Sequence, residues 1–379
     1  MKPLSLYIHL PFCKRKCYYC DFLSFEANPA KQEDYIKALI KEIKAYTDVL
    51  ENYHIESIFM GGGTPSILSS ANIEKIWHSI NEKCHLSQTI ESTIEINPGT
   101  VDKKKLQTYQ DNGINRLSIG LQSTEDDLLK KIGRVHSYNE FLQTYWLARQ
   151  MGFKNINIDL IFGLPNQSLR NWKDTLEKVV KLQPDHISAY SLIIEKDTPF
   201  YNLYQKGEVK DIEESLEREM YYVAQKTLKD AGYKQYETSN FAKEGFECYH
   251  NKAYWTDKEY LGLGLGASSY MNGVRQKNTE SLTHYINQSF DLNEIIETKH
   301  IITKKEHMEE YMFLGLRLIK GVSKKEFETT FNVSIEAIYG DVLNNLEKEQ
   351  FIRHDKDQVC LTQKGIDLSN YVLSEFLLE

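Results

Sequence analysis

Cys13, Cys17 and Cys20 lie within eight positions in the stretch HLPFCKRKCYYCDF, residues 9–22, of a chain that has six cysteines in all. Thiolates bind zinc ions and iron–sulfur clusters, and four of them saturate either kind of centre. Here the spacing is C-x3-C-x2-C and no second C-x2-C pair follows. The pattern therefore predicts a [4Fe–4S] cluster with one iron free of protein ligands, an open position at which a small molecule can bind the metal directly.

The same three cysteines could instead form a zinc site completed by His9, or be unrelated thiols. In a reducing compartment a cysteine group is more often metal-binding or catalytic than disulfide-bonded. The remaining cysteines are scattered and are expected to be ordinary thiols: Cys84, Cys248 and Cys360.

A glycine run supplies a second chemical feature. The apolar residues SIFM (57–60) lead directly into GGGTPS (61–66). Glycines let the backbone approach a ligand closely, so that exposed N–H and C=O groups can hold an amino-acid head group. A plain tight turn before a helix is the alternative for this segment taken alone.

These features are positioned by strand-then-helix units that repeat through the first two thirds of the chain. Strands are predicted at 6–10, at 57–60, within TIESTIEINPG (89–99), NRLSIGLQS (115–123) and NINIDLIFGLP (155–165), and at HISAYSLIIE (186–195). Such repeats imply a parallel sheet with crossover helices, whose sites lie at the carboxyl ends of the strands. We predict an α/β fold, a partial, TIM-like (β/α)6 barrel.

The pattern changes after residue 195. A long helix is predicted at 213–231, followed by an aromatic, glycine-rich stretch and then by helices from about residue 300 with a short hairpin near the end. We predict a core domain at 1–235, a connecting region at 236–295 and a small winged-helix-like domain at 296–379. The last is not strongly basic, so packing or partner binding is expected of it rather than DNA binding.

Composition narrows the class of protein further. The 379 residues include 41% apolar residues, enough for a sizeable core, and the net charge of −8 argues against non-specific nucleic-acid binding. No apolar run approaches the roughly 18 residues of a membrane span. The first residues, MKPLSLYIHLPF, lack the basic region and cleavage site of a signal peptide. We therefore expect a cytoplasmic protein.

The cysteine spacing, with an aromatic residue before the last cysteine, resembles the signature of the radical S-adenosylmethionine (SAM) superfamily. The resemblance implies that the open iron binds the amino and carboxylate groups of SAM. It also implies that an electron, passed to the cluster by a donor protein, splits a C–S bond to give a 5′-deoxyadenosyl radical. The residues it assigns to SAM are Tyr7, Tyr19, Gly62, Gly63, Thr64, Glu95, Gln122, Arg134 and Asp159.

Within this set, the resemblance gives each residue a part. The glycine loop holds the amine, Tyr7 lies near the methionyl end, and Tyr19 packs beside adenine. Glu95 accepts hydrogen bonds from SAM. Gln122 and Asp159 bind the ribose hydroxyls, a usual task for an amide and a carboxylate. Arg134 pairs with the methionine carboxylate, which suits a planar, two-pronged donor.

The order of GGGTPS, EINPG, GLQS, GRVHS and NIDLIFGLP resembles one branch of the superfamily, the oxygen-independent coproporphyrinogen oxidases and their relatives. The oxidases carry a further cysteine, C-x3-C-x2-C-x-C, and a longer N-terminal arm. Here Phe22 stands at that position, and twelve residues precede Cys13. A heme-chaperone subgroup lacks both features and has an H-N-x-x-Y-W motif, which HNKAYW (250–255) matches.

The resemblance implies that the chain binds a [4Fe–4S] cluster, SAM and heme, and delivers heme to apo-hemoproteins, respiratory and membrane-associated ones among them. His250 is the expected heme ligand, since imidazole binds heme iron; a structural hydrogen-bonded histidine is the alternative. A homodimer is left open. The competing functions are decarboxylation of coproporphyrinogen III to protoporphyrinogen IX, and a barrel that holds a cluster for stability only.

Overall fold

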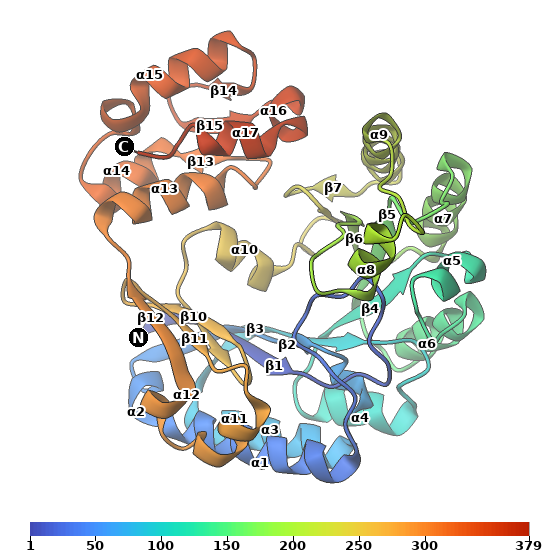
Figure 1. Ribbon diagram of the computed structural model, residues 1–379. Helices are drawn as coiled ribbons and strands as arrows, with labels where there is room; N and C mark the ends of the chain where they lie inside the picture. Colours follow the sequence, from blue (N-terminus) through green and yellow to red (C-terminus); the bar gives the residue numbers. More distant parts are fainter. Residues whose placement is uncertain (379) are drawn as a thin grey trace.

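The computed structural model describes residues 1–378, and its centre is a curved sheet of twelve strands (Figure 1). Six neighbouring strands run parallel in sequence order, as predicted for a partial barrel. They are β1 (Lys2–Leu10), β2 (Tyr53–Gly62), β3 (His85–Ile96), β4 (Arg116–Gln122), β5 (Asn155–Phe162) and β6 (His186–Ser191).

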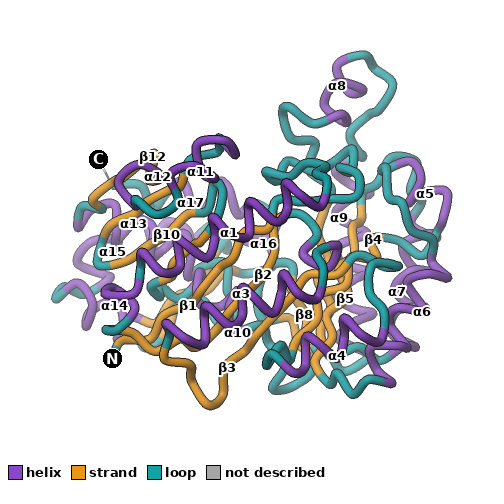
Figure 2. Tube along the Cα trace, turned by 90° about the horizontal axis from the view of Figure 1, so that it is seen from below, coloured by secondary structure: helices purple, strands orange, loops and turns teal. Residues whose placement is uncertain are grey.

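Helices connect these strands and cover the outer face of the sheet, and Figure 2 shows α1 and α3 running across it. Polar side chains start several of them by accepting a hydrogen bond from a first-turn amide, as Ser69 does for α3 and Ser137 for α6. The connecting helices are α1 (Pro29–Ala45), α2 (Thr47–Leu50), α3 (Ser70–Lys83), α4 (Lys103–Asp111), α5 (Asp126–Lys131), α6 (Tyr138–Gln150) and α7 (Leu169–Leu182), with a short 3-10 turn at Pro65–Ile67.

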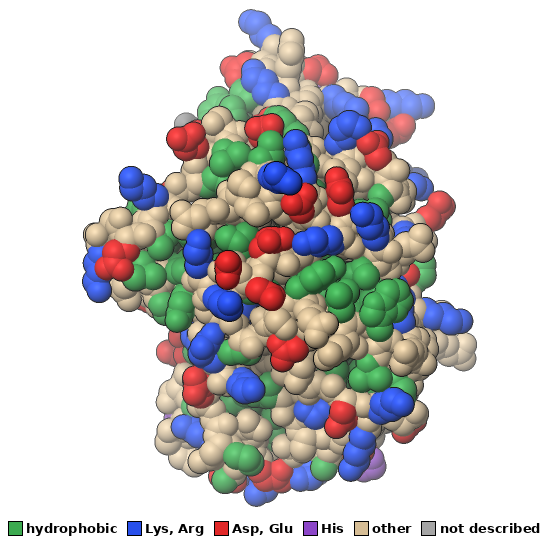
Figure 3. Space-filling model, turned by 90° about the vertical axis from the view of Figure 1, so that its right-hand side faces the viewer, with side chains coloured by type: hydrophobic (Ala, Val, Ile, Leu, Met, Phe, Trp, Pro, Cys, Tyr) green, Lys and Arg blue, Asp and Glu red, His purple; other side chains and the backbone are tan. Residues whose placement is uncertain are grey.

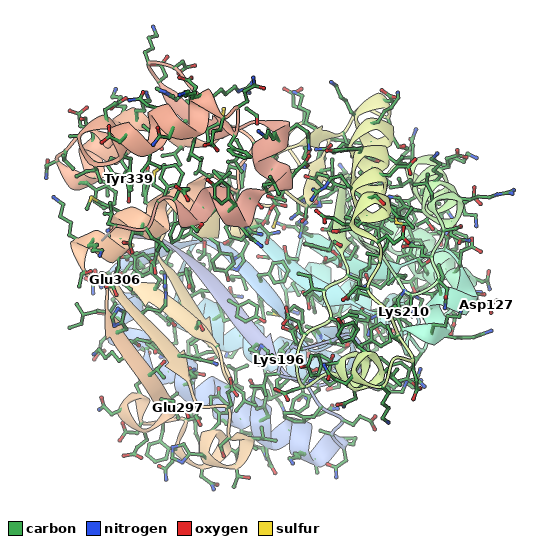
Figure 4. The ribbon with its side chains drawn as sticks, turned by 45° about the horizontal axis from the view of Figure 1, so that its top comes forward. Asp127, Lys196, Lys210, Glu297, Glu306 and Tyr339 are labelled. Atoms are coloured by element: carbon green, nitrogen blue, oxygen red, sulfur yellow. The ribbon has the colours of Figure 1, made fainter. Side chains whose placement is uncertain are left out.

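Beyond β6 the strand prediction was too long. The strand ends at Ser191, and residues 192–195 form a loop instead of continuing it. Ile193 in this loop is 66% exposed, while Leu192 and Ile194 pack against the small apolar cluster that contains Leu128 and Phe200. The apolar residues 192–194, which suggested a continuing strand, therefore lie in a loop, and Lys196, labelled in Figure 4, follows this loop.

The later segments extend both edges of the sheet. After α8 (Pro199–Gln205) and α9 (Glu214–Asp230), strands β7 (Lys234–Gln235) and β8 (Asn240–Ala242) join the β6 edge. The chain then crosses through α10 (Tyr249–Trp255) to the β1 edge. There β9 (Tyr260–Leu263) pairs with β1, and the sheet continues through β10 (Ser268–Met271), β11 (Val274–Asn278) and β12 (Ile296–Ile301). Helices α11 (Leu282–Gln288) and α12 (Leu292–Ile295) lie between the last two strands in sequence.

The C-terminal segment has a hydrophobic core of its own, in which Tyr339, labelled in Figure 4, packs against Phe327 and Phe376. As predicted, it combines helices with a short hairpin, β14 (Ile352–His354) and β15 (Gln358–Leu361), which pairs with β13 (Val322–Ser323). Its helices are α13 (Lys304–Gly315), α14 (Lys324–Phe331), α15 (Ile335–Lys348), α16 (Gln363–Asp367) and α17 (Ser369–Ser374). The predicted domain limits at 235 and 295 stay predictions.

The surface carries both signs of charge. On the face in Figure 3, Lys and Arg side chains are interspersed with Asp and Glu, and no large basic patch stands out. This mixture agrees with the net charge of −8. Among residues 1–378, no helix is both long and apolar enough to cross a membrane.

Candidate functional site

A cavity of about 390 Å³ opens at the carboxyl ends of the parallel strands. Residues from many separate segments converge there, because parallel strands all end at the same edge of their sheet. The loop after β6 contributes part of the rim. Among the predicted site residues, those lining the cavity are Cys13, Cys17, Tyr19, Cys20, Gly62, Gly63, Thr64, Glu95, Gln122, Arg134 and Asp159.

The three cysteines come from the loop that follows β1. All are free and half-buried. Burial raises the pKa of Cys13, and it raises that of Cys20 to about 11. The Thr64 hydroxyl lies 3.6 Å from Cys13 Sγ and opposes the rise in the pKa of Cys13, and Arg134 Nη1 lies 3.7 Å from Cys17 Sγ. Such donors favour the thiolate form, which is the form that binds metal.

This donor set fits an iron–sulfur cluster better than zinc. In residues 1–378, no three His, Cys, Asp or Glu side chains converge closely enough to hold one metal ion. Thiolates that bind three different irons of a cluster stand farther apart than the ligands of one ion. Both ring nitrogens of His9 are engaged outside the cysteine group: Nε2 contacts the Leu23 carbonyl at 2.8 Å and Nδ1 contacts the Tyr7 hydroxyl at 3.0 Å.

The glycine loop is fastened to the cysteine loop. The Gly63 amide donates to the Leu10 carbonyl at 3.0 Å, and the Thr64 amide donates to the Phe12 carbonyl at 2.7 Å. A Cβ atom on Gly63 would come within 2.7 Å of backbone atoms of Leu10 and Phe12, so only glycine fits. Gly62 has a φ of +101°, a conformation that glycine adopts without strain. The loop thus places backbone groups beside the cysteines.

Arg134 joins three of the strand-end segments. Its Nη2 donates to the Gly120 carbonyl at 2.6 Å and to Asn97 Oδ1 at 2.7 Å. The Asn97 amide in turn donates to the Thr64 hydroxyl at 2.9 Å. The remaining Arg134 nitrogen, Nε, is buried without a partner among residues 1–378. A donor held so firmly with one nitrogen free is suited to an anionic ligand such as a carboxylate.

Asn97 lies within the EINPG stretch, but the sequence drew attention to Glu95 there and missed it. The signal was a polar residue directly after a buried strand, before the Pro-Gly turn. Ser118 and Tyr190 line the cavity as well and were also missed. Both lie inside predicted strands, where nothing in the sequence showed which face they occupy.

Two half-buried carboxyl groups, those of Glu95 and Asp159, also line the cavity. Burial, with the nearby Asp159 charge, raises the pKa of Glu95 to about 8, although the Gly62 amide donates to it at 3.2 Å. Burial also raises the pKa of Asp159, but donors from Asn157 at 2.7 Å and Ser118 at 3.0 Å oppose that rise. Asp159 is therefore the better held anion of the two.

Gln122 ends β4 with a φ of +68°, next to an irregularity in the pairing with β5. A left-handed residue at this point turns the chain off the strand. The bend brings the Gln122 amide close to Arg134, since a Cβ added to Gly120 would lie 3.0 Å from both side chains. Tyr19, in the cysteine loop, packs against the apolar cluster that contains Leu128 and Phe200.

Two of the predicted residues do not line this cavity. Tyr7 lies inside the barrel on β1, where its hydroxyl contacts His9 and its ring stacks on Phe59 with centroids 6.4 Å apart. His250 is on α10 and also stacks on Phe59, with 5.2 Å between the ring centroids. The assigned roles of both remain predictions.

His250 is enclosed and fully hydrogen-bonded. It is 1% exposed, and both ring nitrogens have hydroxyl partners: Nδ1 contacts Ser57 Oγ at 2.9 Å and Nε2 contacts Tyr254 Oη at 3.0 Å. Burial and the Arg116 charge lower its pKa to about 3, so the imidazole is neutral. Neutral imidazole is the form that ligates iron, but this one is not presented to solvent.

The fold and the cysteine cavity together define a radical SAM protein. Residues 7–179 match the Radical SAM superfamily, and residues 302–368 match the HemN C-terminal domain. Coproporphyrinogen III oxidase (HemN) from Escherichia coli shares the fold, with a TM-score of 0.87 at 24% identity over 99% of this chain and 90% of that one.

Sequence relatives define the family more narrowly. The chain is 39% identical to the heme chaperone HemW of Bacillus subtilis over 99% of both chains. It is 38% identical to HemW of Lactococcus lactis over 100% of this chain and 98% of that one. It is 32% identical to HemW of E. coli over 100% of this chain and 99% of that one. The chain belongs to the HemW family.

Proposed function

We propose that this protein is a heme chaperone that binds a [4Fe–4S] cluster and SAM, takes up heme and passes it to apo-hemoproteins in the cytoplasm. The observation that carries the proposal is the full-length similarity to HemW proteins, which reaches 39% identity over 99% of both chains. The HNKAYW sequence and the three-cysteine loop are the local features that support it.

In this proposal, Cys13, Cys17 and Cys20 hold the cluster and leave one iron open. The cluster supplies one-electron chemistry and a Lewis-acidic iron when bound. The chain's own residues do the rest. The glycine loop and Thr64 offer backbone and hydroxyl groups to an amine, and Arg134 offers its free Nε to a carboxylate. At a ribose, the Gln122 amide can donate or accept, and the Asp159 carboxylate accepts from the hydroxyls.

For heme, His250 is the proposed ligand and must first leave its hydroxyl partners. Ser57 Oγ donates to Ser5 Oγ at 2.9 Å, so His250 Nδ1–H donates to Ser57. Nε2 is then the nitrogen with the lone pair, and it accepts from the Tyr254 hydroxyl. Iron ligation through Nε2 therefore requires the Tyr254 hydroxyl to give way, and α10 to shift.

The test is hemin titration of anaerobically reconstituted protein, followed by the Soret absorption. His250→Ala is compared with wild type and with His284→Ala, which removes a half-buried histidine on α11. We expect saturable binding by wild type and the control, and at least tenfold weaker binding by His250→Ala. Equal binding by all three would disprove the ligand, and absence of binding by wild type would disprove the chaperone function.

Oxidative decarboxylation of coproporphyrinogen III rests on the fold alone, since the similarity to the oxidase is 24% in sequence. Anaerobic assays with dithionite and SAM are expected to yield no protoporphyrinogen IX. The named acceptors, an electron donor and a homodimer are likewise part of the proposal; co-purification from cells and size-exclusion chromatography test them.

A further inference from the structure

A chain of buried hydrogen bonds joins Asp159, in the cysteine cavity, to the start of α10. Its first link is Asn157, whose Nδ2 donates to Asp159 Oδ1 at 2.7 Å. The same amide nitrogen also donates to Ser118 Oγ at 2.8 Å. The amide oxygen of Asn157 is therefore the atom that faces away from the cavity, toward His186.

His186 carries the chain onward from Asn157 to Tyr236. Its Nδ1 lies 2.7 Å from Asn157 Oδ1, and its Nε2 lies 2.8 Å from Tyr236 Oη. Because the amide oxygen can only accept, Nδ1 carries the proton, and Nε2 accepts from the tyrosine hydroxyl. The ring is fully buried, which lowers the His186 pKa and keeps it neutral in this one tautomer.

Tyr236 connects the ring to α10. Its hydroxyl oxygen accepts from the backbone amide of Cys248, the residue that precedes the helix, at 3.3 Å. The next two amides, of Tyr249 and His250, donate to the Glu91 carboxylate at 3.0 Å each. Tyr236 and Glu91 thus hold the first turn of the helix that carries the proposed heme ligand.

Every link in this chain points the same way. Cys248 N–H donates to Tyr236, Tyr236 O–H to His186, His186 Nδ1–H to Asn157, and Asn157 Nδ2–H to Asp159. Hydrogen bonds in series polarise one another, and the last acceptor here is an anion. The hydrogen bond from Cys248 to Tyr236, at the start of α10, is therefore strongest when the Asp159 carboxylate accepts only from protein donors. It weakens when a ligand also donates to Asp159.

We propose that Asn157, His186 and Tyr236 are positioning residues that couple the cavity to α10, so that a ligand donating hydroxyl hydrogen bonds to Asp159 loosens the helix and eases release of His250. The coupling rests on the proposed function, because it takes the ribose of SAM as the donor and heme as the ligand of His250. The coupling gives a reason for burying the polar side chains of Asn157, His186 and Tyr236 in the barrel interior. Apolar side chains at these positions would pack there without losing hydrogen bonds to water.

The primary test is backbone hydrogen exchange of peptides covering 248–255 in anaerobically reconstituted protein, with and without SAM. Electron paramagnetic resonance of the reduced cluster reports SAM binding in each sample. We expect SAM to speed exchange in α10 severalfold in wild type. Tyr236→Phe removes the hydroxyl that links His186 to Cys248, so α10 should exchange at the same rate with and without SAM.

Tyr233→Phe is the matched control. It removes a similarly buried hydroxyl three residues away, one that donates to the Pro184 carbonyl at 2.8 Å and takes no part in the chain. It should respond to SAM like wild type. If Tyr236→Phe does not fold by circular dichroism, His186→Phe cuts the chain at the next link and is measured the same way. No response in wild type, or an unchanged response in the cut variant, overturns the coupling.

Hemin titration separates this proposal from the function on which it rests. With SAM bound, wild type should bind hemin about fivefold more tightly, a common size for coupling between sites. In Tyr236→Phe that ratio should fall to about one. If wild type binds no hemin while α10 still responds to SAM, the chaperone function fails and the coupling stands. If hemin binds but α10 ignores SAM, the coupling fails and the function stands.

Discussion

The cysteine cavity and the surroundings of His250 differ in how ready they are to bind. In the cavity, thiols line an open space of about 390 Å³, and Arg134 has a buried nitrogen without a partner among the described residues. Around His250, each ring nitrogen has a hydroxyl partner, and the side chain is 1% exposed. On the proposed function, the first region is already open to its ligand, whereas the second would have to open before His250 could bind heme.

The difference has an energetic meaning. A preformed cavity loses little free energy to reorganisation, so its affinity reflects the contacts it makes. A histidine that must give up the hydrogen bond at its ligating nitrogen to bind a metal binds less tightly than its chemistry allows, and the groups that hold that nitrogen closed can adjust the affinity. On the proposed function, a protein that must release heme benefits from a histidine ligand for which the Tyr254 hydroxyl competes.

Removing a thiol is the most severe way to break the first region. In Cys17→Ala we expect loss of the [4Fe–4S] cluster, because two thiolates do not hold it. SAM binding should then be lost completely. Iron content and the paramagnetic resonance signal of the reduced protein measure this. Cys84→Ala, which removes a half-buried thiol outside the cavity, should keep both. A cluster that survives in Cys17→Ala would contradict the assignment.

The two regions should also respond oppositely to pH. The pKa of Glu95 rises from its ordinary 4.5 to about 8, so protonated Glu95 favours the fold and this stabilisation is lost as pH rises through that window. His250, whose pKa falls from 6.5 to about 3, favours the fold more as pH rises from 3 to 6.5. Each group contributes a slope of at most ~1.4 kcal/mol per pH unit.

Denaturant unfolding of the cluster-free chain at a series of pH values measures these slopes. Glu95→Gln should flatten the fall in the free energy of unfolding between pH 5 and 8, while Glu74→Gln, on the exposed side of α3, should leave it as in wild type. Parallel curves for wild type and Glu95→Gln would show that Glu95 does not titrate in this window.

Arg134→Lys tests whether SAM binding requires the several N–H donors of the Arg134 guanidinium group. A lysine keeps the charge but cannot reach the Gly120 carbonyl, Asn97 and a ligand carboxylate together. We expect about tenfold weaker SAM binding with the cluster retained, since a hydrogen bond to a charged group is worth ~1.5–3 kcal/mol. Arg170→Lys, at an exposed ion pair on α7, serves as the control. Unchanged affinity would remove Arg134 from the binding set.

The sequence predicted the cavity better than the closed histidine. The cysteine spacing named the thiols, and the family resemblance named the polar residues at the strand ends. These residues meet because a parallel sheet gathers its carboxyl ends by construction. Asn97 escaped notice because its place depends on contacts with Thr64 and Arg134 from two other loops. The enclosure of His250 depends on Ser57, far away in sequence on β2, and no local pattern reports such a contact.

Tyr254→Phe is the smallest change of the set and tests whether the Tyr254 hydroxyl limits heme binding at His250. It removes only the hydroxyl that occupies His250 Nε2, the nitrogen needed by iron, and keeps the edge-on ring contact with centroids 5.1 Å apart. One net hydrogen bond is worth about 1 kcal/mol, so hemin should bind about fivefold more tightly and leave more slowly. Tyr260→Phe, a neighbouring ring 4.7 Å from Tyr254 by centroids, should not change the affinity. If instead Tyr254→Phe weakens binding, the hydroxyl contacts the heme itself, and His250 is held closed by the packing of α10 rather than by this hydrogen bond.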